Sequence, residues 1–247
     1  MEDKLRTIMQ QDCLAVKCES GVLKTTMPLS AGEGRAEKVD WLVRKAFSQT
    51  PDIKNFPWVV FSYADKPLSL DRCLEIQKSV PYYQPCTSDL TDYTYTYPDY
   101  FFKDCYNYGI SDYEEYRVRV MSAGIKRPTT QALGWLGAPT SPVRNKFIDI
   151  ARSVGQSKIF YRNINWDSDY KTIPPEKYMS VIGQTGMFKY LIDMEGLGYS
   201  PRLKLQFFSY RPVFIVDRPW CEFFYKDLEP WEHYIPVSRD LSDLLEN

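Results

Sequence analysis

Two short segments place serine, proline and arginine close together, in an order that suits the binding of phosphate. They are Ser141-Pro142-Val143-Arg144 and Ser200-Pro201-Arg202. Serine is a good helix N-cap and proline fits the first helical turn, so each segment predicts the start of a helix. Free amides at a helix start attract anions, and an adjacent arginine would complete a diphosphate site. Two well-capped helices with surface arginines explain the same pattern.

Candidate carboxylates for catalysis or metal binding lie in two other places. Asp65 follows the apolar run Trp58–Phe61, where a strand would end and a loop begin. Ligands of open α/β sheets bind at such ends, so Asp65 is a candidate general base; a helix cap or a solvated turn explains it equally well. Asp167-Ser168-Asp169 matches the DxD pattern that clamps a metal and a nucleotide in one large class of transferases, although a turn also favours this composition.

The composition excludes several classes of function. The chain has 247 residues, a formal net charge of -1 and 44% hydrophobic residues, which suits one large domain or two small ones. The near-neutral charge gives no basic footprint for nucleic acid. The first residues are charged where a signal peptide needs an apolar run, and no apolar stretch is long enough to span a membrane. We therefore expect a cytoplasmic protein without a transmembrane segment.

Residues that ligate metals are few. The six cysteines form no CxxC pair, and His233 is the single histidine, which disfavours a zinc site. We expect free thiols in a reducing compartment. His233 lies in the most aromatic stretch of the chain, residues 220–237, and a lone histidine is more often a packed or hydrogen-bonded core residue than a catalyst.

The hydrophobic pattern predicts an α/β fold with parallel sheets. Strand and helix patterns alternate along the second half of the chain, as in doubly wound sheets with helices on both sides. The tyrosine-rich residues 85–116 predict loops and short strands that form the wall of a functional site. Strands are predicted at 58–61, 157–166, 187–196, 211–217 and 233–237. Helices are predicted from Leu70, from Ser141 and from Ser200, and over 174–186, 219–228 and 240–247.

Three blocks of the sequence resemble glycosyltransferase family ninety, the family of the Rumi-type protein O-glucosyltransferases and the fungal capsule xylosyltransferases. Residues 189–245 follow its signature, with KYL, a glycine-rich turn, SPRLK, WCEFFY, LEPW, HYIPV and DLS in order. Residues 135–144 (WLGAPTSPVR) are similar to the segment before a second Ser-Pro-x-Arg, and residues 59–67 (VVFSYADKP) to a strand that ends in a catalytic aspartate. The resemblance covers roughly residues 57–245.

The resemblance implies a GT-B-like fold, in which two Rossmann-like halves hold the active site in the cleft between them. Residues 1–125 would form the acceptor half and residues 126–247 the half that binds a UDP-sugar. It implies inverting transfer of xylose or glucose to a hydroxyl of a glycan or oligosaccharide acceptor, with no cofactor and no required metal.

The resemblance also assigns roles to residues. Asp65 would be the general base, with Asp89, Asp92 and Asp99 in the tyrosine-rich stretch as the next candidates. Glu222, expected in the first turn of a helix, would bind the ribose. The other residues expected to bind the donor are Gly137, Arg144, Leu197, Gly198, Tyr199, Ser200, Pro201 and Arg202. Leu136-Gly137-Ala138-Pro139 stands where the family has Arg-Gly-Ser-Arg, so two of its donor contacts are absent.

Two other functions are compatible with the sequence. One is a metal-dependent transferase of the GT-A kind that uses Asp167 and Asp169. The other is a saccharide-binding protein without catalysis, suggested by the short chain and the absent arginines. Loss of sugar transfer in EDTA would indicate the first, and binding of a UDP-sugar without turnover would indicate the second.

Overall fold

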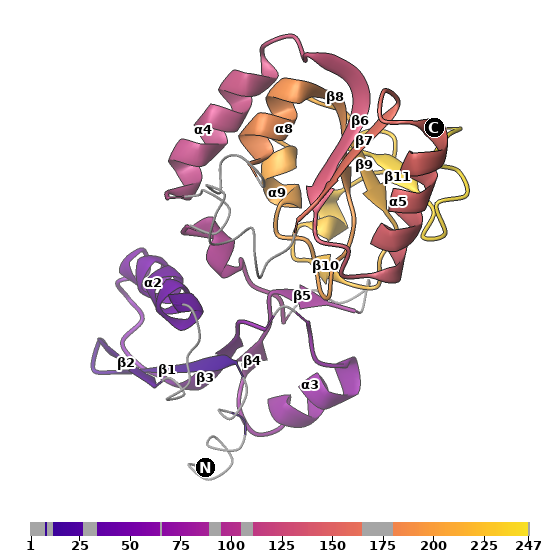
Figure 1. Ribbon diagram of the computed structural model, residues 1–247. Helices are drawn as coiled ribbons and strands as arrows, with labels where there is room; N and C mark the ends of the chain where they lie inside the picture. Colours follow the sequence, from indigo (N-terminus) through magenta and orange to yellow (C-terminus); the bar gives the residue numbers. More distant parts are fainter. Residues whose placement is uncertain are drawn as a thin grey trace. The chain divides into compact units, whose positions relative to one another are not determined.

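The computed structural model describes residue 8 and residues 12–26, 34–64, 66–88, 95–104, 111–164 and 180–246. The chain divides into two compact units, each with its own sheet (Figure 1). Unit 1 consists of Met1–Lys103 and Trp220–Lys226, and unit 2 of Asp104–Pro219 and Asp227–Asn247. The α/β class predicted from the sequence is confirmed. The acceptor half at 1–125 and the UDP-sugar half at 126–247 stay a prediction. The division into compact units does not test which part of the chain binds which substrate.

Unit 1 contains a four-stranded mixed sheet, in the order β2-β1-β3-β4. Strand β1 is antiparallel to β2 and to β3, and β3 is parallel to β4. The strands are β1 (Cys13–Glu19), β2 (Val22–Thr26), β3 (Phe56–Ser62) and β4 (Tyr82–Tyr83). The helices of this unit include α2 (Arg35–Ser48) and α3 (Leu70–Gln77). Buried residues from the sheet and α3 form its core: Cys13, Ala15, Val60, Cys73, Ile76, Val80 and Tyr82.

Unit 2 contains a five-stranded sheet in the order β11-β9-β8-β6-β7, in which every pair of neighbours is parallel. The strands are β6 (Thr130–Gly137), β7 (Ile159–Asn163), β8 (Phe188–Asp193), β9 (Val213–Val216) and β11 (Ile235–Val237). The helices are α4 (Tyr113–Gly124), α5 (Pro142–Val154), α8 (Val181–Met187) and α9 (Leu203–Gln206). Helix α5 covers one face, and α4, α8 and α9 lie on the other (Figure 1). This is the doubly wound arrangement that the alternating pattern predicted.

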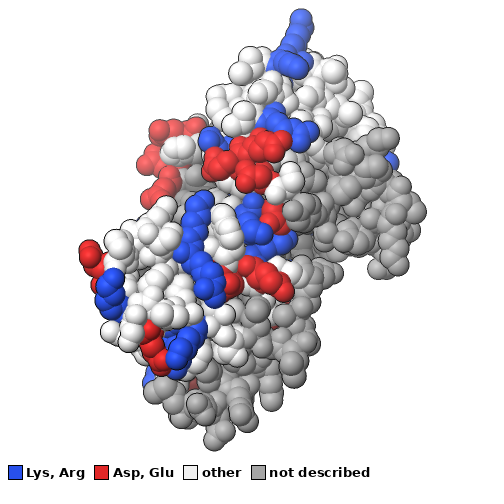
Figure 2. All heavy atoms as spheres, turned by 90° about the vertical axis from the view of Figure 1, so that its left-hand side faces the viewer, with Lys and Arg blue, Asp and Glu red and all other residues white. Residues whose placement is uncertain are grey.

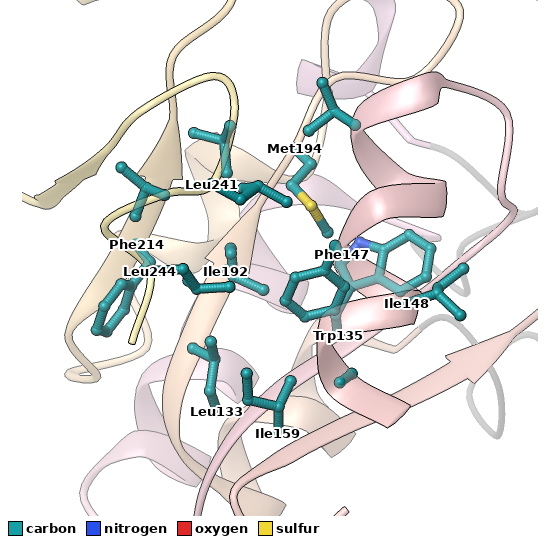
Figure 3. Close-up of a cluster of buried hydrophobic side chains, with 14 residues drawn as sticks. Leu133, Trp135, Phe147, Ile148, Ile159, Ile192, Met194, Phe214, Leu241 and Leu244 are labelled. Carbon is teal, nitrogen blue, oxygen red and sulfur yellow. The ribbon is translucent and has the colours of Figure 1, made fainter. Parts of the chain in front are cut away.

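The core of unit 2 lies between α5 and the sheet (Figure 3). Trp135 on β6 is fully buried, and its ring meets the edge of Phe147 on α5 at 5.8 Å between centroids. Ile192 and Met194, at the end of β8, fill the space beside these rings. The apolar stripe of α5 is therefore what fixes Ser141 and Arg144, at its N-terminus, against the end of β6.

Two helices predicted near the C-terminus are absent from the described residues. Over 219–228 the chain forms β10 (Cys221–Glu222), antiparallel to β5 (Cys86–Thr87), and then a 3₁₀ turn, η4 (Tyr225–Asp227). Consecutive aromatic residues lose rotamer freedom in a helix and suit extended or irregular backbone. The ring of Phe223 accordingly packs on the rings of Phe102 and Phe224, with centroids 6.0 and 5.4 Å apart.

The segment 240–246 forms turns rather than the predicted last helix. Asp243 accepts hydrogen bonds from the backbone N–H and the hydroxyl of Ser238, each at 2.9 Å. Leu241 has a left-handed backbone, with φ 59°. These local bonds compete with a helical ladder, and they place Leu241 and Leu244 in the core of unit 2.

The other predictions from the sequence can be compared with the described residues. The strands predicted in the second half, the helices from Leu70 and Ser141 and the end of the helix at 174–186 are confirmed, the last as α8. The region 85–116 does contain short elements, but α4 begins in it at Tyr113. The five cysteines that the structure describes are buried thiols: Cys13, Cys18, Cys73, Cys86 and Cys221.

Two further observations concern the surface and the helices. Basic and acidic side chains are interspersed on the face drawn in Figure 2 and do not separate by sign. None of the helices in the described part of the chain is long and apolar enough to cross a membrane.

Candidate functional site

The parallel sheet of unit 2 has one point at which the strand order reverses. In chain order the strands are β6, β7, β8, β9 and β11, whereas β6 lies in the sheet between β7 and β8. The connections that follow β6 and β8 therefore leave in opposite directions. In open α/β sheets, ligands bind outside the carboxyl ends of the strands at such a point. The candidate site consists of the segments that follow these two strands, together with the residues after β9 and β11 that reach them.

Arg144 joins the ends of β6 and β8. Ser141 caps α5 by accepting a hydrogen bond from the N–H of Arg144 at 3.3 Å, and its own hydroxyl donates to the carbonyl of Glu195 at 3.1 Å. The guanidinium of Arg144 donates to the carbonyl of Ala138 and to that of Met194, both at 3.0 Å. The predicted cap is confirmed. Arg144 is 9% exposed and spans the switch point rather than standing on the surface.

Gly196 is required by this arginine. A Cβ atom at Gly196 would lie 3.2 Å from both terminal nitrogens of Arg144, closer than ordinary van der Waals contact. Gly137 has a similar local reason, because a Cβ atom there would lie 2.6 Å from the ring of Trp135. Both glycines are therefore explained by contacts within the protein, whether or not a ligand approaches them.

Ser200 does not open a helix, contrary to the sequence prediction. Its hydroxyl donates to Oδ1 of Asp193 at 2.5 Å, and α9 begins only at Leu203 and has four residues. The N-cap position of α9 is Arg202, without a side-chain cap. The serine pattern gave the wrong start because a buried carboxylate at the end of β8 competes for the hydroxyl. The prediction of a helix that begins at Ser200 is therefore wrong, and binding of a diphosphate by this segment stays a prediction.

Asp193 is the centre of a buried polar network. It is fully buried, and Oδ2 accepts a hydrogen bond from Arg218 at 2.6 Å. Arg218 also donates to the backbone carbonyl of Asp193 at 2.9 Å and is itself 4% exposed. This pair connects the end of β8 to the segment after β9. Together with Ser200 it fixes the segment that carries the glycine-rich turn.

A second ion pair lies at the same edge of the sheet. Arg239, two residues after β11, contacts Glu195 through both terminal nitrogens, at 2.5 and 3.1 Å. The side chain of Glu195 is 5% exposed and that of Arg239 is 46% exposed. The segment Asp193–Ser200 is thus held by side chains from three neighbouring connections.

Among the residues predicted to bind the sugar donor, Arg202 has the position that best suits an anionic ligand. It is 4% exposed, and its guanidinium donates to the carbonyl of Leu136 near the end of β6. Among the described acidic side chains, none forms an ion pair with Arg202, whereas Arg218 and Arg239 each contact a carboxylate. A backbone carbonyl does not neutralise a positive charge, and buried charges normally face an opposite one. The position of Arg202 favours an anionic ligand.

The other predicted donor residues are divided between the two units. Leu197, Gly198, Tyr199 and Pro201 lie in the turn after β8 in unit 2, where Leu197 is 70% exposed and Tyr199 is buried. Glu222 lies in unit 1, in strand β10 and not in a helix, and is 1% exposed. Its role at the ribose stays a prediction.

Several predicted carboxylates lie outside the described residues: Asp65, Asp89, Asp92, Asp167 and Asp169. Asp99, an alternative base, is buried in unit 1 and accepts a hydrogen bond from the N–H of Phe101 at 3.1 Å, which caps a 3₁₀ turn. His233 is exposed and not part of a core, but it is hydrogen-bonded, because its Nδ1 accepts from the N–H of Glu229 at 2.9 Å.

Sequence reasoning missed four side chains of the site: Asp193, Glu195, Arg218 and Arg239. Each lies at or within two residues of the carboxyl end of a predicted parallel strand. That position was the signal that could have found them, because carboxyl ends of parallel strands meet at one edge.

The fold and the site together define a doubly wound α/β protein with a candidate ligand site built around arginines at the switch point. A protein-family model described as glycosyl transferase family 90 matches residues 35–247. The chain therefore belongs to glycosyltransferase family 90, as the sequence motifs predicted.

Known members of this family show similarity over part of the chain. "Protein O-glucosyltransferase 1" of Rattus norvegicus is 38% identical over 114 residues, which are 44% of this chain and 29% of the relative. The human protein of the same name is 36% identical over 114 residues, with the same shares of the two chains. The "O-glucosyltransferase rumi homolog" of Aedes aegypti is 28% identical over 152 residues, 57% of this chain and 38% of the relative. The chain thus matches about a third of the length of these relatives.

Proposed function

We propose that this protein transfers a sugar from a UDP-sugar to a hydroxyl group of a glycan acceptor. Membership of glycosyltransferase family 90 supports sugar transfer. The names of its relatives favour glucose over xylose and add a protein hydroxyl as an acceptor to be tested. The observation that carries the proposal is the buried Arg202 beside the end of β6.

The charges at the switch point suit a diphosphate. Arg218 is paired with Asp193 and Arg239 with Glu195, so these charges cancel, whereas the buried Arg202 adds a positive charge that no described carboxylate pairs with. The diphosphate of a nucleotide sugar carries about two negative charges, and arginine forks bind such groups in charge-assisted hydrogen bonds. Positive charge held in a buried site also stabilises UDP as it departs.

The proposed reaction is a single displacement with inversion. Asp65 accepts the proton of the acceptor hydroxyl, and the oxygen attacks the anomeric carbon from the face opposite UDP. The bond between that carbon and the phosphate oxygen breaks, and UDP leaves with the electron pair. Because arginines supply the positive charge, we propose that no metal ion is required.

UDP release from UDP-glucose and UDP-xylose, with and without EDTA, tests the reaction. We expect turnover with one or both donors in EDTA. Loss of turnover in EDTA would indicate a metal-dependent transferase that uses Asp167 and Asp169. Tight binding of a UDP-sugar with no turnover on any glycan or protein acceptor would indicate a saccharide-binding protein.

Replacing Arg202 with alanine tests the donor site directly. Loss of a charge-assisted contact should weaken UDP binding by about 1.5–3 kcal/mol, measured by calorimetry. Arg152→Ala, at an arginine whose side chain is 60% exposed on α5, is the matched control and should bind UDP normally. Melting temperatures show whether each variant is folded. A folded Arg202→Ala protein with unchanged UDP affinity would contradict the assignment.

Asp65→Asn tests the base. The amide keeps the size of the side chain but cannot accept the proton, so sugar transfer should fall about a hundredfold to ten-thousandfold. UDP affinity and melting temperature should stay at wild-type values. If transfer is retained, another carboxylate is the base, and Asp89 and Asp92 are the next to replace. If stability falls while transfer persists, Asp65 caps the following helix instead.

A further inference from the structure

The edge of the unit 2 sheet opposite the candidate site carries exposed apolar side chains. Strands β6, β8 and β9 begin there, and α4 leads into β6 at this edge (Figure 1). A large apolar residue precedes each strand: Ile125 is 78% exposed, Met187 is 43% exposed and Tyr210 is 59% exposed. Because the strands are parallel neighbours, these three turns lie along one edge. We call these three residues the amino-edge cluster.

Contacts of the backbone hold the three turns together. A Cβ atom at Gly124 would lie 2.0 Å from the carbonyl oxygen of Ser209 and 3.1 Å from the ring of Tyr210, so the end of α4 lies directly against that turn. Thr129 donates to the carbonyl of Gly186 at 3.3 Å and, through its hydroxyl, to that of Met187 at 3.2 Å. The amino-edge cluster is therefore preformed.

Arg211 adds a further connection between the same turns. Its guanidinium donates to the carbonyl of Thr185 at 3.1 Å and to that of Lys126 at 2.5 Å. Tyr210, beside it, has a left-handed backbone with φ 52°, a strained conformation for an aromatic residue. The folded protein keeps Tyr210 in this strained conformation, and the Tyr210 ring is exposed to solvent.

The charges in the segments nearest the cluster have one sign. The four segments that lead into β6, β7, β8 and β9 are residues 121–131, 154–160, 185–190 and 207–213, and none contains an acidic residue. Their charged residues are Lys126, Arg127, Lys158, Lys189 and Arg211. Lys126, Arg127, Lys158 and Lys189 are exposed. The amino edge is thus basic and apolar at the neighbouring strands β9, β8, β6 and β7, although the whole chain has a formal net charge of -1. The segment that leads into β11, at the end of the same edge, contains the exposed acidic residues Asp227, Glu229 and Glu232.

We propose that the part of this edge formed by β9, β8, β6 and β7 docks on the surface of a bilayer that contains anionic lipids. Basic residues are attracted to anionic head groups, and an exposed tyrosine and aliphatic side chains beside them can enter the boundary between head groups and acyl chains. The apolar side chains stand on three separate turns along one edge, which suits simultaneous contact with a flat surface. The candidate site, at the opposite edge of the sheet, then faces away from the bilayer. This surface is independent of sugar transfer.

Co-sedimentation with vesicles tests the proposal. The two probes are phosphatidylcholine vesicles and vesicles of phosphatidylcholine and phosphatidylglycerol at a molar ratio of about three to one. We expect the protein to bind the anionic vesicles and to remain in solution with the neutral ones. Lys126→Gln with Arg127→Gln should weaken binding about 25-fold, since each basic residue near an anionic surface contributes about fivefold. The control is Lys78→Gln with Lys146→Gln, which removes the same charge from exposed positions elsewhere.

A second pair of variants tests the apolar part. Ile125→Ser with Tyr210→Asn should weaken binding by about tenfold or more, and asparagine tolerates the left-handed backbone at 210. Leu245→Ser, at a leucine that is 61% exposed, is the control and should bind normally. Circular dichroism confirms that each variant is folded.

Three results would overturn the proposal. The first is no binding of the wild-type protein to anionic vesicles. The second is equal binding by the wild-type protein and both edge variants. The third is binding to soluble polyglutamate as tight as the binding to anionic vesicles and unchanged in the double variant Ile125→Ser with Tyr210→Asn. That result would indicate an acidic protein as the partner.

Discussion

Replacement of Asp193 by alanine should cause a large loss of stability, because it removes the carboxylate from a buried ion pair. The side chains of Asp193 and Arg218 are 0% and 2% exposed, and their closest atoms lie 2.6 Å apart. Removing one partner of such a pair leaves the other charge in a poorly solvated place, which costs about 3–5 kcal/mol. In a protein of this size each kcal/mol lowers the melting temperature by about 2–4 °C, so the expected fall is roughly 6–20 °C.

Urea unfolding gives the most direct measurement of this effect. The midpoint should fall while the slope with denaturant stays constant, because the surface exposed on unfolding is nearly the same. Asp193→Asn, which retains one of the two acceptor oxygens but not the charge, should lie between the wild type and Asp193→Ala. The matched control is Asp149→Ala: its carboxylate lies 3.1 Å from Arg152, but the two side chains are 72% and 60% exposed. It should unfold at the wild-type midpoint. Equal midpoints for Asp193→Ala and Asp149→Ala would refute the argument that burial makes the first pair essential.

Two further predictions concern packing and pH. Gly124→Ala should destabilise the protein by about 1–3 kcal/mol, because the new methyl group would lie 2.0 Å from the backbone oxygen of Ser209. Gly186→Ala, with nothing within 4 Å of the new atom, is the control, and equal urea midpoints for the two variants would disprove the clash. Burial raises the pKa of the Cys13 thiol from 9.0 to about 12. The buried, neutral thiol therefore makes its full contribution to the free energy of unfolding below pH 9.0, and this contribution is lost as the pH rises toward about 12. Between about pH 8 and pH 10 the wild type should lose about 1.4 kcal/mol more than Cys13→Ala, and parallel pH profiles in urea would contradict this.

The sequence predicted the parallel sheet of unit 2 well because the pattern there is strong. Apolar runs such as Val213–Val216 are buried along their whole length, and such runs are typical of strands covered on both faces. The family was also predictable, since its motifs are long and ordered. In contrast, β1, β2 and α2 carried no signal that was recognised, although β2 alternates exposed and half-buried residues.

Two of the wrong helix predictions, near Ser200 and at 219–228, have one physical cause. Each was displaced by a contact that the local pattern does not contain. Ser200 donates to Asp193, seven residues away. Glu222 pairs with Cys86 on a strand far away in the sequence. Local propensity is a weak guide where a partner distant in the chain supplies a stronger interaction.

The arginines of the site show why residue type was easier to predict than role. Arg144 and Arg202 were expected to bind the donor, and both side chains already bind backbone carbonyls at the end of β6 or β8. A carbonyl occupies some donors of a guanidinium but leaves its charge intact, so one side chain can fix the strand ends and attract a diphosphate. Lysine at position 202 keeps the charge without the fork. If the positive charge at position 202 provides most of the attraction for UDP, Arg202→Lys should retain part of the UDP affinity that Arg202→Ala loses. If the planar guanidinium is needed, the two variants should lose UDP affinity equally, since neither can hold the Leu136 carbonyl and a phosphate at once.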